Sequence, residues 1–219
     1  MTGSHAPRIA LIHALAHSVA PINDAMARSW PEAMRVNLLD DSLSSDLAQG
    51  RGGSAMEARF ISLAAYAIGS GADAILFTCS AFGTHIEAVQ QRWPALPVLK
   101  PNEAMIDEAM AVAAGGPIGL VASFAPTGES MPREFPTDAR VEVELAPAAL
   151  AALDVGDLDG HDRAALRAGE ALVERGCSVV ALAQFSLARA APLLRSSLRV
   201  PVLTTVDSAI AALKRRVAG

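Results

Sequence analysis

The sequence predicts an α/β fold with two similar, pseudo-symmetric halves of the βαβα type, each built on a four-stranded, mainly parallel sheet. Short apolar runs alternate with helical patterns along the whole chain, which is typical of parallel strands connected through helices. The composition is 52% hydrophobic but only 4% aromatic, which favours close packing of helices on sheets over an all-β sandwich. The second half of the chain also repeats the pattern of the first.

The first half, residues 1–115, is predicted to contain four strands and four helices, with packing of the last helix on the other half left open. Residues 1–7 are polar and are expected to be frayed, and residues 40–53 are expected to form a polar, acidic loop. The predicted strands are 8–13, 34–39, 74–77 and 96–99, and the predicted helices are 18–29, 54–69, 84–92 and the stretch that begins at the cap Asn102. Ser54 and Glu57 are spaced as a capping box for the second of these helices.

The second half, residues 116–219, begins where Gly115 and Gly116 interrupt the pattern. A short helix is expected from Thr127, because two prolines follow it closely, and residues 146–160 are expected to be irregular. The predicted strands are 117–122, 140–145, 178–183 and 200–203, and the later helices are 161–175, a stretch from about residue 187, and 207–217.

The two halves can be matched to each other residue by residue. Residues 70–79 resemble residues 175–184, and Leu-Pro-Val-Leu at 96–99 resembles Val-Pro-Val-Leu at 200–203. This match indicates a duplicated domain, since the period is far longer than the roughly 20–50 residues of repeat arrays. If the halves face each other, equivalent strand ends line one cleft, which is the expected active site. The residue that corresponds to Cys79 is then Gln184.

Cys79 is the first candidate for chemistry. It follows the apolar run 74–77 and precedes a predicted helix. In open α/β sheets, ligands bind at the carboxyl ends of the strands, and the positive end of a helix dipole favours a thiolate. The alternative interpretation is that Cys79 is a small buried apolar residue, because free cysteines are among the most buried residue types.

Composition and charge exclude several functions. The net charge of -5 without a basic stripe argues against nucleic acid as a partner. No apolar run reaches the roughly 20 residues of a membrane span, so no membrane partner is expected. The two cysteines make no disulfide framework, which together with the lack of a signal-peptide pattern predicts a reducing, cytoplasmic location. No metal site is predicted: His13 and His17 have i, i+4 spacing, but His13 should end a strand.

Three short motifs resemble the aspartate/glutamate racemase superfamily, which includes hydantoin racemases, arylmalonate decarboxylase and maleate isomerase. They are Thr-Cys-Ser-Ala at 78–81, Ala-Ser-Phe-Ala-Pro-Thr at 122–127 and Ala-Gln-Phe-Ser at 183–186. The resemblance covers almost the full length. It implies a cofactor-independent enzyme that acts beside the carboxylate of a small amino acid or carboxylic acid. The family is often dimeric or larger, which is compatible with a homo-oligomer here.

One position departs from the family pattern. In the two-base racemases, a cysteine after each of two equivalent strands flanks the substrate carbon, but the second of these positions is Gln184 here. Glutamine can neither donate nor accept a proton in catalysis near neutral pH. Cys177 cannot replace the missing thiol, because it lies at the other end of the same predicted strand and is interpreted as a core residue.

Three single-thiol hypotheses follow. In the first, Cys79 works with a different partner, for which His13 and His17 are candidates because histidine titrates near neutrality. In the second, Cys79 only reprotonates the carbanion left by decarboxylation. In the third, Cys79 attacks a substrate carbon covalently. An isomerase or racemase is favoured, with a decarboxylase of a malonate-like acid or a binding protein that has lost turnover as alternatives. The catalytic candidates are Cys79 and His13, and the substrate-binding candidates are His17, Ser80, Ala81, Thr127, Gln184, Phe185 and Ser186.

Overall fold

The computed structural model describes residues 6–218 and divides the chain into two compact units. The first unit holds the residues up to Lys100 together with those from Ile210 onward, and the second holds Pro101–Ala209. Most of the segment expected to be frayed, residues 1–5, lies outside the described residues. Each unit is described by itself below.

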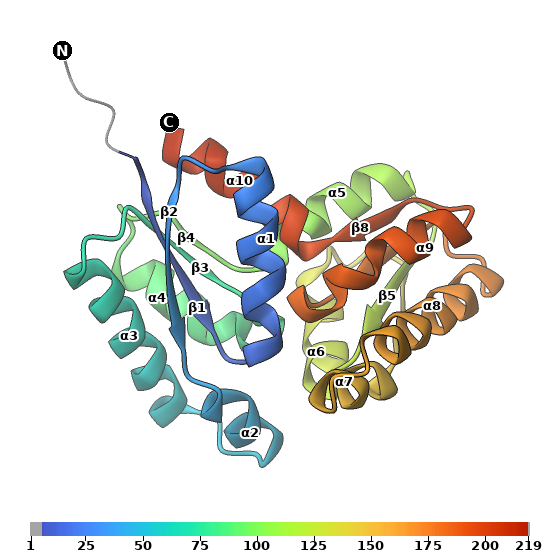
Figure 1. Ribbon diagram of the computed structural model, residues 1–219, viewed down its shortest axis with the longest axis horizontal. Helices are drawn as coiled ribbons and strands as arrows, with labels where there is room; N and C mark the ends of the chain where they lie inside the picture. The colour runs from blue at the N-terminus through green and yellow to red at the C-terminus, as the bar shows by residue number, and fades with distance from the viewer. Residues whose placement is uncertain (1–5, 219) are drawn as a thin grey trace. The chain divides into compact units, whose positions relative to one another are not determined.

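The first unit is built on a parallel four-stranded sheet with the order β2-β1-β3-β4 (Figure 1). Its strands are β1 (Arg8–His13), β2 (Met34–Leu39), β3 (Ala74–Phe77) and β4 (Val98–Leu99). In the register, Ile12 of β1 lies opposite Phe77 of β3, so the two central strands end side by side. All four residues of β3 are buried, as expected for a strand covered on both faces.

Helices cover both faces of this first sheet (Figure 1). Apolar side chains of α3 (Ser54–Gly69) and α4 (Gly83–Arg92) pack against Ile12, Ile75 and Phe77. The helix α1 (Val19–Ser29) lies on the other side. The end of α10 (Thr205–Ala218) is joined to α1, because Lys214 donates a hydrogen bond to the carbonyl of Ser29.

The second unit repeats this arrangement with the order β6-β5-β7-β8, again entirely parallel. Its strands are β5 (Ile118–Ala122), β6 (Val141–Leu145), β7 (Val179–Leu182) and β8 (Val202–Thr204). The predicted fold class, α/β with two similar four-stranded parallel sheets, is therefore confirmed. A crossover through a helix is needed between parallel neighbours, which explains why helices alternate with strands in both units.

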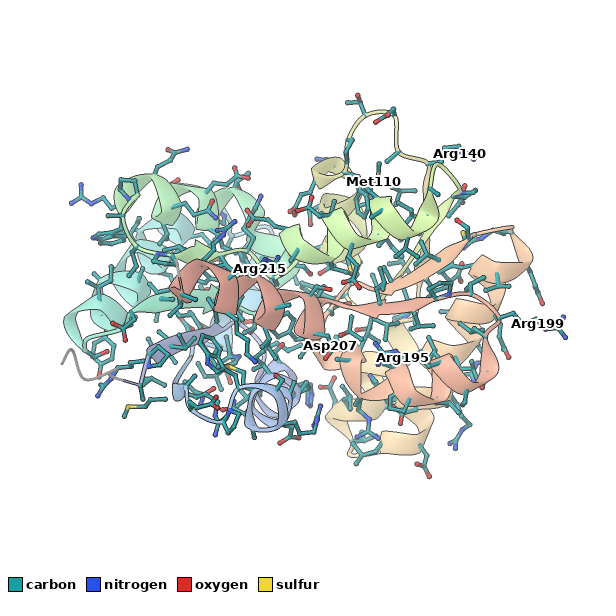
Figure 2. All side chains as sticks on the ribbon, turned by 90° about the horizontal axis from the view of Figure 1, so that it is seen from above. Met110, Arg140, Arg195, Arg199, Asp207 and Arg215 are labelled. Carbon is teal, nitrogen blue, oxygen red and sulfur yellow. The ribbon has the colours of Figure 1, made fainter. Side chains whose placement is uncertain are left out.

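Alternate residues of β5 point to different helix layers in the second unit. Ile118 and Leu120 pack with α5 (Glu103–Ala113), whereas Val121 packs with α7 (Pro147–Asp154), α8 (Leu158–Glu174) and α9 (Ala191–Ser197). On that second side, Arg195 of α9 forms an ion pair with Asp207 in the first turn of α10 at 3.3 Å (Figure 2).

The compact units differ from the halves that the sequence predicts. Because α5 packs on the second sheet, it belongs to the second unit, although its residues precede Gly115. The end of α10 belongs to the first unit. That the sequence consists of two duplicated halves that meet at residues 115 and 116 remains a prediction.

Two segments expected to lack regular structure contain helices. The predicted loop 40–53 includes α2 (Ser42–Ala48), and the predicted irregular stretch 146–160 includes α7 and the start of α8. Pro147 stands in the first turn of α7, where proline is favoured, and the alanines and leucines that follow are strong helix formers. The expected cap Ser54 is also wrong by one residue, since Gly53 is the N-cap of α3 with φ 83°.

The remaining elements are short. They are α6 (Ala125–Ser130) and the 3₁₀ turns η1 (Ala16–Ser18), η2 (Ser80–Phe82), η3 (Met131–Glu134) and η4 (Phe185–Ala190). Within residues 6–218, no helix is long and apolar enough to cross a membrane.

Candidate active site

Cys79 lies just past the carboxyl end of β3, where the chain leaves the sheet. Its backbone is extended, and it precedes the 3₁₀ turn η2, which leads into α4 at Gly83. A small pocket of the first unit contains the thiol and the end of β1; it is lined by Ile12, His13, Ala14, Leu43, Phe60, Phe77 and Cys79. The structure thus brings together the two predicted catalytic candidates, Cys79 and His13.

The thiol of Cys79 is protonated in the resting protein at neutral pH. Burial raises its pKa to about 11, although interactions with the backbone of Ala81 and the side chain of Ser44 act in the opposite direction. The sequence led us to expect a thiolate supported by a helix N-terminus. That expectation is wrong for this state, because η2 separates Cys79 from α4 and the dipole effect falls off within one turn.

His13 is fully buried at the end of β1 and both of its ring nitrogens are engaged. Its Nε2 lies 2.9 Å from Asn37 Oδ1, and its Nδ1 lies 2.8 Å from Thr78 Oγ1. Asn23 Nδ2 donates both to the carbonyl of Val19 and to Asn37 Oδ1, which fixes that oxygen as an acceptor.

These contacts determine the tautomer of His13. Nε2 carries the proton and donates it to Asn37, while Nδ1 accepts a hydrogen bond from the hydroxyl of Thr78. Burial lowers the pKa of His13, although the hydrogen bond with Asn37 raises it in part. The neutral ring therefore links β1, β2 and the residue directly before Cys79.

Gln184 occupies the corresponding place after β7 in the second unit. Its side-chain Oε1 accepts hydrogen bonds from the backbone amides of Ser123 (2.6 Å) and Phe124 (3.2 Å) and from the hydroxyl of Ser123 (3.2 Å). Since backbone amides can only donate, they fix the orientation of the side-chain amide. The Nε2 group of Gln184 then faces the other way, and no described residue accepts a hydrogen bond from it.

The other predicted site residues are distributed over the two units. In the first unit, His17 lies in η1 and is half-buried, while Ser80 and Ala81 begin η2 directly beside Cys79. In the second unit, Thr127 is buried in α6, and Phe185 and Ser186 follow Gln184 in η4. The hydroxyl of Ser186 is buried without a hydrogen-bond partner in the part of the chain that the structure describes.

Two residues near the candidate site were missed by sequence reasoning. Ser123 was quoted within a motif but given no role, although it holds Gln184. Ser44 lies on α2, and its hydroxyl donates a hydrogen bond to the carbonyl of Ala14 at 2.5 Å. The long polar loop was the available signal for Ser44, but nothing in it distinguishes this serine from Ser42 or Ser45.

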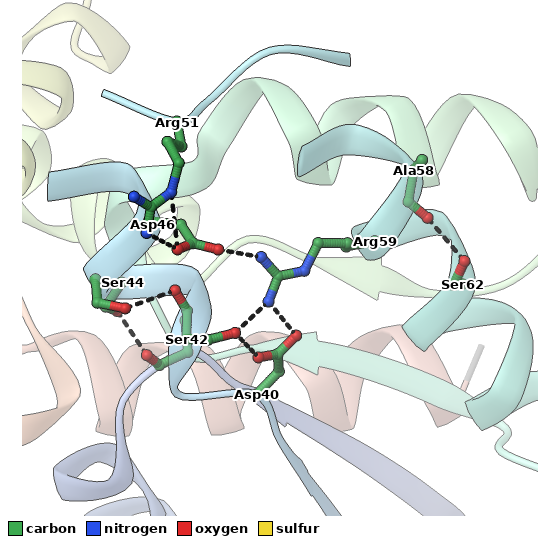
Figure 3. Close-up of polar contacts among 10 residues, drawn as sticks. Asp40, Ser42, Ser44, Asp46, Arg51, Ala58, Arg59 and Ser62 are labelled. Atoms are coloured by element: carbon green, nitrogen blue, oxygen red, sulfur yellow. Dashed lines mark hydrogen bonds and ion pairs between the residues drawn. The ribbon is translucent and has the colours of Figure 1, made fainter. Parts of the chain in front are cut away.

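Charged side chains around α2 form an ion-pair network that is centred on the guanidinium of Arg59 (Figure 3). Arg59 of α3 contacts Asp40 and Asp46, each at 2.6 Å. Burial alone would raise the pKa of Asp40, but hydrogen bonds from Ser42 and Arg59 outweigh this and lower it. Hydrogen bonds from Arg51 and Arg59 lower the pKa of Asp46, so both carboxylates are charged at neutral pH.

No group of three or more histidine, cysteine, aspartate or glutamate side chains in residues 6–218 is arranged to hold a metal ion.

Comparisons with known proteins agree with this architecture. The family model described as Asp/Glu/Hydantoin racemase matches residues 16–213. The glutamate racemase from Francisella tularensis in complex with D-glutamate superposes with a TM-score of 0.72 at 14% identity, covering 96% of this chain and 81% of that one. Allantoin racemase from Klebsiella pneumoniae gives 0.69 at 18% identity, with 97% and 88% covered.

A decarboxylase has the same fold. Unliganded arylmalonate decarboxylase superposes with a TM-score of 0.68 at 16% identity, covering 97% of this chain and 93% of that one. No curated protein sequence matches the chain significantly. At such low sequence identities, the solved structures establish the fold of this chain but not its chemistry.

Proposed function

The chain belongs to the Asp/Glu/hydantoin racemase family, and we propose that it is a cofactor-independent racemase or isomerase acting at the carbon beside a carboxylate. Its substrate would be a small amino acid or carboxylic acid. The observation that carries this proposal is the partly exposed Cys79 at the carboxyl end of β3, in one pocket with His13. Ligands of open α/β sheets bind at such strand ends.

In this proposal Cys79 is the only side chain at the site that exchanges a proton with the substrate carbon. The resting thiol first loses its proton to water. The thiolate then removes the proton from the substrate carbon, leaving an enolate and a neutral thiol, and return of that proton to the same face restores the substrate. Gln184 cannot supply a second acid, and His13 is neutral with both nitrogens engaged. A proton that arrives on the opposite face would therefore come from water, and the hydroxide left behind would take the proton of the thiol and restore the thiolate.

Gln184 is assigned to substrate binding. Its carbonyl is held by Ser123 and Phe124, which leaves two N–H donors for a carboxylate or enolate oxygen. Donors that are already oriented stabilise developing negative charge without reorganisation. That Cys79 and Gln184 serve the same bound substrate is predicted from the match between the halves of the sequence.

A second candidate is the decarboxylation of a malonate-like acid. The observation that favours it is the protonated resting thiol, since the pKa of Cys79 is raised to about 11. Loss of CO2 leaves a carbanion that needs a proton donor and no base. The thiol would protonate that carbon, and the resulting thiolate would recover its proton from water.

The experiment that separates these reactions is incubation of the protein in D2O with malonates, maleate, amino acids and hydantoins. Deuterium uptake without CO2 release supports racemisation or isomerisation, and CO2 release supports the decarboxylase. Binding of one of these acids with neither reaction indicates a protein that has lost turnover.

The same assay tests the thiol. Cys79→Ala should lower turnover at least about 100-fold, the usual size of a proton-transfer contribution. Cys177→Ala is the matched control, because Cys177 is a buried core residue of the second unit and should be dispensable for turnover. Full activity in Cys79→Ala would defeat the proposed mechanism.

A further inference from the structure

One side chain of the neighbouring helix α3 makes several of the contacts that hold α2. Arg59 of α3 contacts Asp40, just before α2, and Asp46, within it, each at 2.6 Å (Figure 3). Arg59 also donates to the hydroxyl of Ser42 at 2.5 Å. A seven-residue helix has little stability of its own in water, so these contacts, together with burial of Leu43, hold α2 in place.

Held in this way, α2 forms part of the wall around Cys79. Leu43 is 1% exposed and lines the same pocket as Cys79 and His13. The next residue, Ser44, reaches the carbonyl of Ala14 at 2.5 Å, and Ala14 also lines that pocket. The Ser44 side chain is thus tied to the end of β1 beside this pocket, and its interaction with the thiol of Cys79 lowers the pKa of that thiol.

We propose that Ser44 is a positioning residue for the Cys79 sulfur and that the contacts of Arg59 with Asp40 and Asp46 hold it in position. This inference rests on the proposed function in giving Cys79 the chemical role. A serine hydroxyl has one proton to donate and two lone pairs to accept with. In the resting protein it donates to the carbonyl of Ala14, and its interaction with Cys79 lowers the pKa of the thiol.

The same hydroxyl can serve the thiolate. Once the sulfur has lost its proton, rotation of the Ser44 hydroxyl directs its O–H from Ala14 to the negative sulfur. A hydrogen bond to the charged form stabilises that form. Ser44 therefore favours the thiolate that the proposed reaction requires, without adding a charge that would repel or trap an acidic substrate.

The test is the rate at which iodoacetamide alkylates Cys79 at pH 8, followed by mass spectrometry of the peptide that contains it. Because only the thiolate reacts, Ser44→Ala should slow this alkylation by about fivefold, the effect of one net hydrogen bond. Ser45→Ala is the matched control, since the Ser45 hydroxyl is exposed and donates only to the carbonyl of Ser42. It should leave the rate unchanged.

A second variant separates the hydrogen bond from access to the sulfur. Ser44→Thr keeps the hydroxyl but enlarges the side chain, so recovery of the alkylation rate cannot come from easier access. Alkylation in Ser44→Ala at the wild-type rate or faster overturns the role of Ser44. This readout needs no turnover, so its failure is distinct from failure of the proposed enzyme activity.

The contribution of Arg59 is tested in the same assay. Arg59→Gln removes both ion pairs and should slow alkylation as Ser44→Ala does, with no further loss in the double variant because both act through the same hydroxyl. Arg51→Gln is the control: its side chain is 58% exposed and contacts only Asp46 of the two carboxylates. A wild-type rate in Arg59→Gln overturns the positioning role of that residue.

Discussion

Single polar atoms decide what the candidate site can do. His13 was predicted as a catalytic partner because histidine titrates near neutrality, but its two nitrogens contact Asn37 and Thr78. A ring that is held in one tautomer between β2 and the residue that follows β3 is suited to fixing the backbone that leads into Cys79. We propose this positional role for His13 in place of a proton-transfer role.

Gln184 provides a prediction at this scale. Gln184→Glu keeps an oxygen for the amides of Ser123 and Phe124, but it removes the N–H donors and adds a negative charge. Binding of a carboxylate ligand should weaken about tenfold to a hundredfold, since a hydrogen bond to a charged group contributes about 1.5–3 kcal/mol. Titration calorimetry with malonate and with D-glutamate measures the change.

The control adds the same charge elsewhere in the chain. Gln49→Glu changes an exposed residue that follows α2, and it should leave the affinity unchanged. Equal affinities of Gln184→Glu and the wild type would remove Gln184 from the binding site.

Sequence reasoning found the residues that chain position alone can identify. Cys79 follows an apolar strand, and Gln184 was found through the internal match. Ser44 could not be found, because its role depends on where Arg59 places α2, and Ser123 could not, because its amide contacts a side chain 61 positions away. Such long-range contacts follow from packing, which one sequence does not reveal.

At the scale of elements, strands and long helices were predicted well, whereas the short helices α2 and α7 were missed. Of the eight strands in residues 6–218, seven lie within predicted segments, and β8 extends one residue past the predicted 200–203. Apolar runs between turn residues are a strong signal. The seven-residue α2 was missed, since its serines and aspartate are typical of a loop and tertiary contacts with Arg59 override that preference. The stability of α2 therefore depends on its contacts with α3.

Two glycines make the packing of elements testable. Gly119 is in the central strand β5, and a Cβ there would lie 3.0 Å from the Leu172 side chain of α8. Gly119→Val should lower the free energy of unfolding by about 1–3 kcal/mol through overpacking. Thermal or urea unfolding measures this loss.

Gly69, at the end of α3, is the opposite case. It is exposed, and a Cβ there would meet nothing within 4 Å. Gly69→Ala should raise the free energy of unfolding by about 0.4–1 kcal/mol, because it restricts the unfolded chain. If Gly119→Val were as stable as the wild type, the close approach of α8 to β5 would be wrong.

For the whole molecule, the buried and paired ionisable groups predict how stability depends on pH. Burial lowers the pKa values of His13 and His85, so the unfolded chain binds protons more readily and stability should fall as the pH drops below about 6.5. Asp40, Asp46 and Asp162 have lowered pKa values. Their contribution is complete above about pH 4 and is lost as the pH falls further.

Melting temperatures measured from pH 7 to pH 3 should therefore decrease in two stages. His13→Gln should flatten the first stage and leave the second. A melting temperature that stays constant between pH 7 and pH 5 in the wild type would contradict the neutral, buried state of His13.

The path of α10 has a consequence for how the protein forms in the cell. This helix starts in the second unit at Thr205, but its residues from Ile210 belong to the first, where Lys214 reaches Ser29 and the ring of Trp30. A ribosome makes these residues only after it has made Pro101–Ala209. The first unit therefore cannot be completed during translation of its own strands and must stay open until synthesis has passed through the whole of the second.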